Sequence, residues 1–235
     1  MSTGVLALQT PPDEPRWHGG ILFDDSVRHT LRLRSAQDRH VARRVGDMPY
    51  YAAGLLPLIV DPLVVALAVR RDSKTALNLE LIGLEAFSYA GLLSYVSTRI
   101  SVRERPDATE CRRTEPDPSR CPVDNEAFWS GHTSIVATSA GLVCAHHQYL
   151  PLWGGGAADV AACALAATGA AVTSVSRIMA DRHYATDVLA GSSIGFLSGY
   201  AMPTLLHYTR RERVQVSVTP AQLGDGATLQ LLGRF

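Results

Sequence analysis

Long stretches with almost no charged residues recur along this chain of 235 residues, and they constrain its fold more than any other feature. Five of them cover residues 48–69, 76–98, 133–150, 157–176 and 187–206. Each is close to the ~20 residues that a helix needs to cross a bilayer, and charged residues crowd between them. The pattern predicts an all-α bundle of about five transmembrane helices, with a soluble helical bundle as the alternative.

The composition excludes several other classes of protein. Charged residues make up 19% of the chain, below the ~25% that is usual for soluble domains. Lysine plus arginine and aspartate plus glutamate both number 22, so the net charge of zero argues against a nucleic-acid partner held by bulk positive charge. Four cysteines in a chain of this length exclude a small disulfide-dense fold.

The chain divides into a polar N-terminal segment (1–47), a helical domain (48–207) and a C-terminal tail (208–235). Residues 23–45 place apolar side chains among many Arg and Asp at partly helical spacing. This spacing predicts an amphipathic helix, either at the membrane interface or packed on the bundle. In the tail, valines alternate with polar residues before a Gly-Asp-Gly turn at 224–226, which predicts a short β-hairpin.

The strongest chemical signal is Ser176-Arg177, followed after five residues by His183 and after three more by Asp187. His183 and Asp187 are four residues apart, so a helix that begins here places them on one face. A carboxylate beside an imidazole fixes its tautomer and leaves the other ring nitrogen to act as nucleophile or base. Arg177 offers a forked donor set for a phosphate or carboxylate. The alternative is a buried structural His–Asp pair beside a helix-end arginine.

A second signal, Ser130-Gly131-His132, stands immediately before the third apolar stretch. Ser130 is a good N-cap, and Gly131 permits close approach of the backbone to a ligand. The unpaired N–H groups at a helix start bind anions, and His132 is placed to give a proton to a leaving oxygen. The alternative is an ordinary serine cap followed by an interfacial histidine.

A third signal, the run from Arg103 to Asp107 (RERPD), follows the second apolar stretch. By itself it is typical of a positively charged flank at a membrane surface. In an up-and-down bundle, however, the loops at 99–129 and 177–186 lie at the same end. Two histidines, at least two arginines, a carboxylate and a helix N-terminus would then meet. We therefore expect a phosphate site with a nucleophile and an acid.

These motifs resemble those of the type 2 phosphatidic acid phosphatase superfamily, which also contains bacterial acid phosphatases and vanadium haloperoxidases. The family patterns KxxxxxxRP, PSGH and SRxxxxxHxxxD correspond here to residues 98–106, 129–132 and 176–187. The third pattern matches in full. The likeness in motifs covers residues 98–187 and leaves the N-terminal segment, the first helix and the tail uncovered.

The resemblance implies a role for each matching residue. His183 would attack phosphorus to form a phosphohistidine, Asp187 would orient His183, and His132 would protonate the departing alcohol. The groups that would hold the phosphoryl oxygens are Arg105, Arg177, Ser130 and the amide of Gly131. The resemblance implies no metal and no other cofactor, and the sequence has no clustered ligand motif of the usual metal-site kinds.

Two positions depart from the family patterns. Thr98 stands where the family has lysine, and Arg99, one residue along, would point about 100° away around a helix. Arg99 and Arg103 are both candidates to supply the missing charge. Trp129 replaces the proline of PSGH, which shapes the turn without taking part in the chemistry.

The cysteines bear on the cellular compartment. Cys111 and Cys121 lie in the hydrophilic loop beside the expected site, where we predict a disulfide on an oxidising face. Cys144 and Cys163 flank a turn at similar depth, and there we expect free cysteines in a packed core, with a second disulfide as the alternative. The arginines and lysines are nearly balanced between the two ends, so the Cys111–Cys121 pair decides for an extracytoplasmic active site.

The sequence and the resemblance together predict a metal-independent phosphatase that acts on a phosphomonoester or diphosphate, with a phosphorylated lipid as the favoured substrate. We expect an integral protein of a bacterial inner membrane, with no nucleic-acid partner. A soluble periplasmic bundle is the alternative location. Two other functions stay open: a phosphatase-like protein that binds phosphorylated lipid with weak or no turnover, and a haloperoxidase, which would need bound vanadate.

Overall fold

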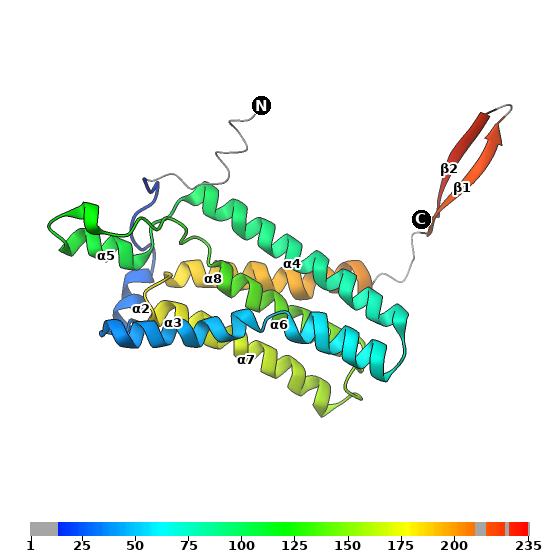
Figure 1. The fold of residues 1–235 in the computed structure, drawn as a ribbon, viewed down its shortest axis with the longest axis horizontal. Coiled ribbons are helices and arrows are strands. Elements are labelled where there is room, and N and C mark those ends of the chain that lie inside the picture. Colours follow the sequence, from blue (N-terminus) through cyan, green and yellow to red (C-terminus); the bar gives the residue numbers. More distant parts are fainter. Residues whose placement is uncertain (1–13, 210–214, 224–225, 235) are drawn as a thin grey trace.

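A bundle of long helices forms the body of the protein (Figure 1). The computed structural model describes residues 14–209, 215–223 and 226–234. Its elements are α2 (Asp24–Leu31), α3 (Ala36–Tyr51), η1 (Leu55–Val69), α4 (Ser73–Ser101), α5 (Pro106–Thr114), η2 (Pro118–Arg120), α6 (Gly131–Tyr149), α7 (Ala157–Met179), α8 (Ala185–Phe196), η3 (Leu197–Ala201), η4 (Thr204–Tyr208), β1 (Gln215–Leu223) and β2 (Gly226–Arg234). The predicted all-helical body is confirmed, since all five apolar stretches are helical.

Local sequence signals explain where several of these helices begin. The side chains of Ser35, Asp72 and Ser130 accept hydrogen bonds from backbone amides three residues on, and they cap α3, α4 and α6. η1 is a π-helix that contains Pro62. A proline lacks the amide hydrogen of a regular helical turn, and wider turns accommodate such breaks.

Helix α6 is the central helix of the bundle. It contacts α3, α4, α7 and α8, and most of its residues are buried. Along α8 and η3, the glycines Gly191, Gly195 and Gly199 face the backbone of α6 so closely that a Cβ at any of them would collide with an α6 carbonyl or its N-cap. The small residues of the fifth apolar stretch therefore allow close helix packing.

Three helical segments of the described chain are long and apolar enough to cross a membrane: Ala36–Val69, Ser73–Ser101 and Ala157–Met179. No more than a third of the most apolar window in each is buried inside the protein. Leu77, Leu81, Leu84 and Leu92 of α4 all expose more than half of their surface. Outward-facing leucines on such helices suit contact with lipid. The count of five spans stays a prediction.

The described part of the N-terminal polar segment contains two helices, and both pack on the bundle. α2 contacts α7 and α8, while α3 contacts α6 and α7. The chain leaves helical geometry between Leu31 and Ala36, near Arg34, where the apolar spacing is interrupted. α3 runs across the predicted boundary at residues 47 and 48, so the polar segment passes into the apolar stretch without a linker.

At the C-terminal end, β1 and β2 pair antiparallel, with Gln215 opposite Arg234 and Leu223 opposite Gly226. They form a two-stranded sheet. The first two residues of the predicted Gly-Asp-Gly turn lie outside the described residues.

Two disulfides link the four cysteines. Cys111 on α5 is bonded to Cys121, as the sequence predicts. Cys144 on α6 is bonded to Cys163 on α7, so the prediction of free cysteines there was wrong. The two helices form an antiparallel hairpin that brings residues at equal distance from the turn face to face, and the Cα atoms of this pair are 4.5 Å apart.

Candidate functional site

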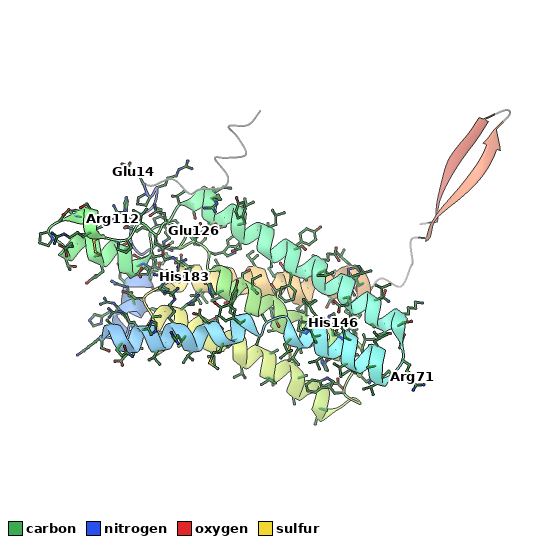
Figure 2. The ribbon with its side chains drawn as sticks, in the orientation of Figure 1. Glu14, Arg71, Arg112, Glu126, His146 and His183 are labelled. Carbon is green, nitrogen blue, oxygen red and sulfur yellow. A yellow bond between two sulfur atoms is a disulfide. The ribbon has the colours of Figure 1, made fainter. Side chains whose placement is uncertain are left out.

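The three sequence motifs meet at one end of the bundle, where α4 and α7 end and α6 and α8 begin (Figure 1). Figure 2 shows His183 at this end together with Arg112 and Glu126, whereas His146 and Arg71 lie toward the other end. Direct contacts join the motifs, since Arg105 lies against His183 and Ser130 donates its amide to the carbonyl of Asp187.

His183 has one occupied ring nitrogen and one that faces cations. Nδ1 lies 2.9 Å from the carbonyl oxygen of Ala127, which only accepts hydrogen bonds, so the hydrogen is on Nδ1. Nε2 lies 3.4 Å from Nη1 of Arg105. Burial, together with the positive charges of Arg105 and Arg177, holds the pKa of His183 well below its ordinary value. The ring is therefore neutral, and the lone pair on its Nε2 accepts from Arg105.

Asp187 lies beside His183 and does not hydrogen-bond it. Its Oδ2 is 3.8 Å from Nδ1 of His183, which is too long for a hydrogen bond. The carboxylate instead accepts from the amide of Tyr184 at 2.8 Å and from Nη1 of Arg103. Asp187 thus braces the start of α8, and it positions the adjoining His183 through the backbone.

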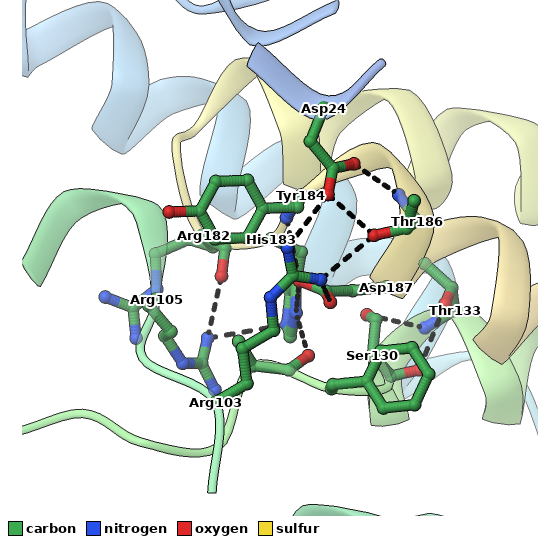
Figure 3. Close-up of polar contacts among 12 residues, drawn as sticks. Asp24, Arg103, Arg105, Ser130, Thr133, Arg182, His183, Tyr184, Thr186 and Asp187 are labelled. Atoms are coloured by element: carbon green, nitrogen blue, oxygen red, sulfur yellow. Dashed lines mark hydrogen bonds and ion pairs between the residues drawn. The ribbon is translucent and has the colours of Figure 1, made fainter. Parts of the chain in front are cut away.

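Arg103 is fully buried within a polar network (Figure 3). Its guanidinium pairs with Asp187 and with Asp24 of α2, the latter at 2.8 Å. The rings of Trp17 and Tyr184 lie at centroid distances of 4.0 and 4.2 Å from its guanidinium carbon. Arg103 is therefore enclosed as a structural cation and does not face the open side of the site.

Asp24 joins the N-terminal segment to the third motif. Its oxygens accept from the amide and hydroxyl of Thr186, at 2.8 and 2.7 Å, and from the amide of Ile21 at 2.9 Å. Burial alone would raise its pKa, but these hydrogen bonds and the one from Arg103 lower it overall. The carboxylate is ionised, and it accepts from Nη2 of Arg103 while Asp187 accepts from Nη1.

Arg105 and Arg182 lie at the site, and each forms ion pairs with nearby aspartates. Arg105 Nε lies 2.6 Å from Asp124. Arg182 pairs with Asp107 and again with Asp124, both at 2.7 Å. Burial lowers the pKa of Arg105 from its ordinary value, against the opposing effect of Asp124, and its guanidinium stays charged in proteins. These carboxylates hold the two guanidinium groups in place.

Arg177 and His132 face a carboxylate from a part of the chain outside the motifs. Asp47 of α3 lies 3.0 Å from Nη1 of Arg177 and 3.5 Å from Nε2 of His132. The ring of Tyr50 lies against that of His132, tilted by 31° with centroids 4.2 Å apart. Burial, followed by the charges of Arg177 and Arg105, lowers the pKa of His132 to about 3. The imidazole is neutral while the site holds no added anion.

Ser130 and Gly131 form the start of α6 as predicted. The hydroxyl of Ser130 accepts the amide of Thr133 at 3.5 Å and is fully buried. A Cβ at Gly131 would lie 3.1 Å from Oγ of Ser94, so a larger residue would crowd α4. The N-terminus of α6 is therefore closely packed against α4.

The position of the absent lysine is occupied by the uncharged Thr98. The hydroxyl of Thr98 donates to the carbonyl of Tyr95 in the same helix. Arg99 pairs with Glu126 at 2.7 Å and lies over the ring of Tyr95. Neither described contact brings Arg99 to His183.

Reasoning from the motifs missed several residues that the structure adds: Asp24, Arg43, Asp47, Tyr50, Asp124 and Arg182. Arg43 lies one helical turn before Asp47, and its charge acts on both His132 and Arg177. Arg182 adjoins His183 in sequence, and this adjacency was the one available signal. The others come from segments outside the motifs. Among the residues described, no group of three or more His, Cys, Asp or Glu is arranged to hold a metal ion.

Comparisons with known proteins bear on the family and the fold of this chain. A family model described as PAP2 superfamily matches residues 80–211. A crystal structure of a transmembrane PAP2 type phosphatidylglycerolphosphate phosphatase from Bacillus subtilis superposes with a TM-score of 0.59 at 19% identity, covering 81% of this chain and 87% of that one. Aquifex aeolicus LpxE gives a TM-score of 0.49 at 14% identity, covering 76% and 93%. A search of curated proteins finds no match.

Proposed function

Because this chain belongs to the PAP2 superfamily, whose model matches more than half of it, we propose that it is a metal-independent phosphatase. The substrate is a phosphomonoester or a diphosphate, and the reaction passes through a phosphohistidine on His183. One observation carries the proposal. The hydrogen on Nδ1 of His183 is held by the Ala127 carbonyl, and the lone pair on Nε2 faces Arg105.

The first step transfers the phosphoryl group to the enzyme. Nε2 of His183 forms a bond to phosphorus while the bond from phosphorus to the ester oxygen breaks. The departing oxygen takes a proton from His132. That imidazole is neutral without ligand. The negative charge of a bound phosphate group raises its pKa, so that the ring takes up a proton from solvent.

The second step frees the enzyme. Water attacks phosphorus, gives its proton to His132, and displaces Nε2 of His183, so that inorganic phosphate leaves. Arg105, Arg177, Ser130 and the Gly131 amide hold the phosphoryl oxygens in both steps. Forked guanidinium groups and a helix N-terminus suit the charge that builds on those oxygens in the transition state. Asp187 positions His183 through the start of α8.

A lipid is the favoured substrate because the site adjoins helices suited to a membrane. α4 and α7, which end at the site, are both candidate spans with exposed apolar side chains. A headgroup phosphate can reach the arginines while acyl or prenyl chains stay in the bilayer. The relative from Bacillus subtilis, named as a transmembrane phosphatidylglycerolphosphate phosphatase, supports a lipid phosphate of this kind.

We place the site on the extracytoplasmic face of a bacterial inner membrane. The Cys111–Cys121 disulfide supports this sidedness, because it lies on α5 and the following loop at the end of the bundle that carries the site. Disulfides persist in oxidising compartments.

The test is phosphate release by the purified full chain in detergent, with EDTA present. The substrates are phosphatidic acid and a prenyl diphosphate, and His183→Ala is the matched variant. Release that survives EDTA and disappears in the variant supports the mechanism. A well-folded wild type that binds phosphatidic acid without releasing phosphate favours the binding protein instead. Halide oxidation after loading with vanadate favours a haloperoxidase.

A further inference from the structure

Asp47 brings a carboxylate into a site whose other groups attract anions. It lies on α3, outside the three motifs and outside the residues matched by the family model. Its Oδ1 is 3.0 Å from Nη1 of Arg177 and 3.5 Å from Nε2 of His132. These are the two groups that the proposed reaction assigns to a phosphoryl oxygen and to the leaving oxygen. The carboxylate therefore stands where the substrate's charge has to go.

The hydrogen bonding of this contact is incomplete. Arg177 is buried, yet its Nε and Nη1 have no hydrogen-bond partner among the described residues, and Oδ1 of Asp47 is likewise unpaired by hydrogen-bond geometry. Charge attraction holds the two groups together without satisfying the guanidinium. A phosphate group, with more oxygens to accept from the fork, satisfies Arg177 better than this carboxylate does.

Close packing of α3 against α7 places Asp47. A Cβ at Gly46 would lie 2.9 Å from Cβ of Ser176, and the hydroxyl of Thr173 donates to the Gly46 carbonyl at 3.0 Å. One helical turn further along α3, the ring of Tyr50 packs against His132. The backbone under Asp47 is thus held beside the site, and its side chain is free only to rotate.

We propose that Asp47 is an internal anion that occupies the phosphate position while the site is empty. An arriving phosphate group displaces the carboxylate from Arg177 and His132, and the carboxylate returns when inorganic phosphate leaves. The competition weakens phosphate binding and speeds product release. The inference rests on the proposed function for its role in turnover, while the displacement itself concerns phosphate binding alone.

The experiment measures binding of inorganic phosphate to the detergent-solubilised full chain by titration calorimetry with EDTA present. The proteins are the wild type, Asp47→Asn, and the control Asp38→Asn, which removes an exposed carboxylate from the same helix. We expect Asp47→Asn to bind phosphate about tenfold more tightly, with Asp38→Asn equal to the wild type. In Asp47→Asn, inorganic phosphate should inhibit turnover at a lower concentration and the KM should fall, while kcat does not rise.

Unchanged or weaker phosphate binding by folded Asp47→Asn overturns the inference, since it shows that Asp47 supports Arg177 and does not compete with the ligand. Absence of phosphate binding by every variant overturns it as well. If Asp47→Asn does not fold, Asp47→Ser removes the same charge and is judged by the same criterion. If Asp47→Asn binds phosphate more tightly but the wild type hydrolyses no ester, the proposed function is disproved. The inference that phosphate displaces Asp47 then still holds.

Discussion

Both ends of the bundle contain a histidine beside aspartates, and the two clusters differ in what the imidazole can do. At the end opposite the site, His147 has one ring nitrogen against Asp159 and the other 3.2 Å from Asp61. Trp153 donates its ring N–H to Asp61 and its amide to Asp159. Every polar group of that imidazole is occupied.

At the site end, His183 donates one N–H to a carbonyl, and its other nitrogen faces Arg105. Its nearest carboxylate, Asp187, is taken up by Arg103 and the start of α8. A His–Asp pair is therefore no sign of a reactive site by itself. The chemical difference is that the second nitrogen of His183 faces an arginine that donates to it, whereas both nitrogens of His147 face carboxylates.

The largest expected effect comes from removing the proposed nucleophile. His183→Ala should lower kcat by about 10⁴-fold or more, because the nucleophile itself is lost. Phosphate release per folded molecule, measured with EDTA present, checks this. A variant that keeps more than a tenth of the wild-type rate would mean that another group attacks phosphorus.

The same kind of change at the other end should affect stability and spare catalysis. His147→Leu leaves Asp61 and Asp159 buried without the imidazole between them, which should destabilise the protein by about 3–5 kcal/mol. Denaturant unfolding in detergent measures this loss. Activity per folded molecule stays close to the wild type, and a selective loss of kcat at unchanged stability would contradict the comparison.

A smaller effect is expected from the cation that faces the nucleophile. Arg105→Gln removes charge stabilisation of the transferring phosphoryl group and should lower kcat/KM by about 10²-fold. Steady-state kinetics with His147→Leu as the control measure the effect. An equal loss in both variants would show that it reflects folding alone.

The pH dependence should show the lowered pKa of His183. The nucleophilic form of His183 is the neutral imidazole. Burial and two arginines hold its pKa below the ordinary 6.5, so the ring stays mostly neutral at pH 6.5. The acidic limb of kcat/KM should therefore lie below pH 6.5, and the same shift makes the folded state lose stability as pH falls below that value. An acidic limb with its midpoint at or above pH 6.5 would contradict this. So would a midpoint that stays the same in Arg105→Gln.

The smallest effect is expected at Thr98. Thr98→Lys restores the lysine of the family pattern at the edge of the site, and an added cation there should raise kcat/KM by about two- to tenfold. Kinetics at low and high salt check the electrostatic origin, because screening should reduce the gain. No change would indicate that the arginines already present supply the charge.

Local signals in the sequence were sufficient for the helices and for the three motifs. Caps such as Ser130 and long apolar stretches act over a few residues, so they can be recognised without the fold. The convergence of the motifs also followed, since loops of an up-and-down bundle alternate between its ends. The sequence therefore determined His183, His132, Arg105 and Arg177 as candidates.

The tertiary structure decided how these groups are held. Asp24 binds Thr186, 162 residues away, and encloses Arg103, which the sequence left as a candidate phosphate ligand. The Ala127 carbonyl takes the hydrogen-bonding position that was assigned to Asp187. Cys144 and Cys163 are paired because a helical hairpin brings them together.

The same division explains why Asp47 was missed. Nothing in the local sequence of α3 marks this residue, and its position depends on the close approach of Gly46 to Ser176 across 130 residues of chain. Residue types and helical spacing are properties of the chain itself. The identity of each side chain's partner depends on packing between distant segments, and only the folded bundle determines it.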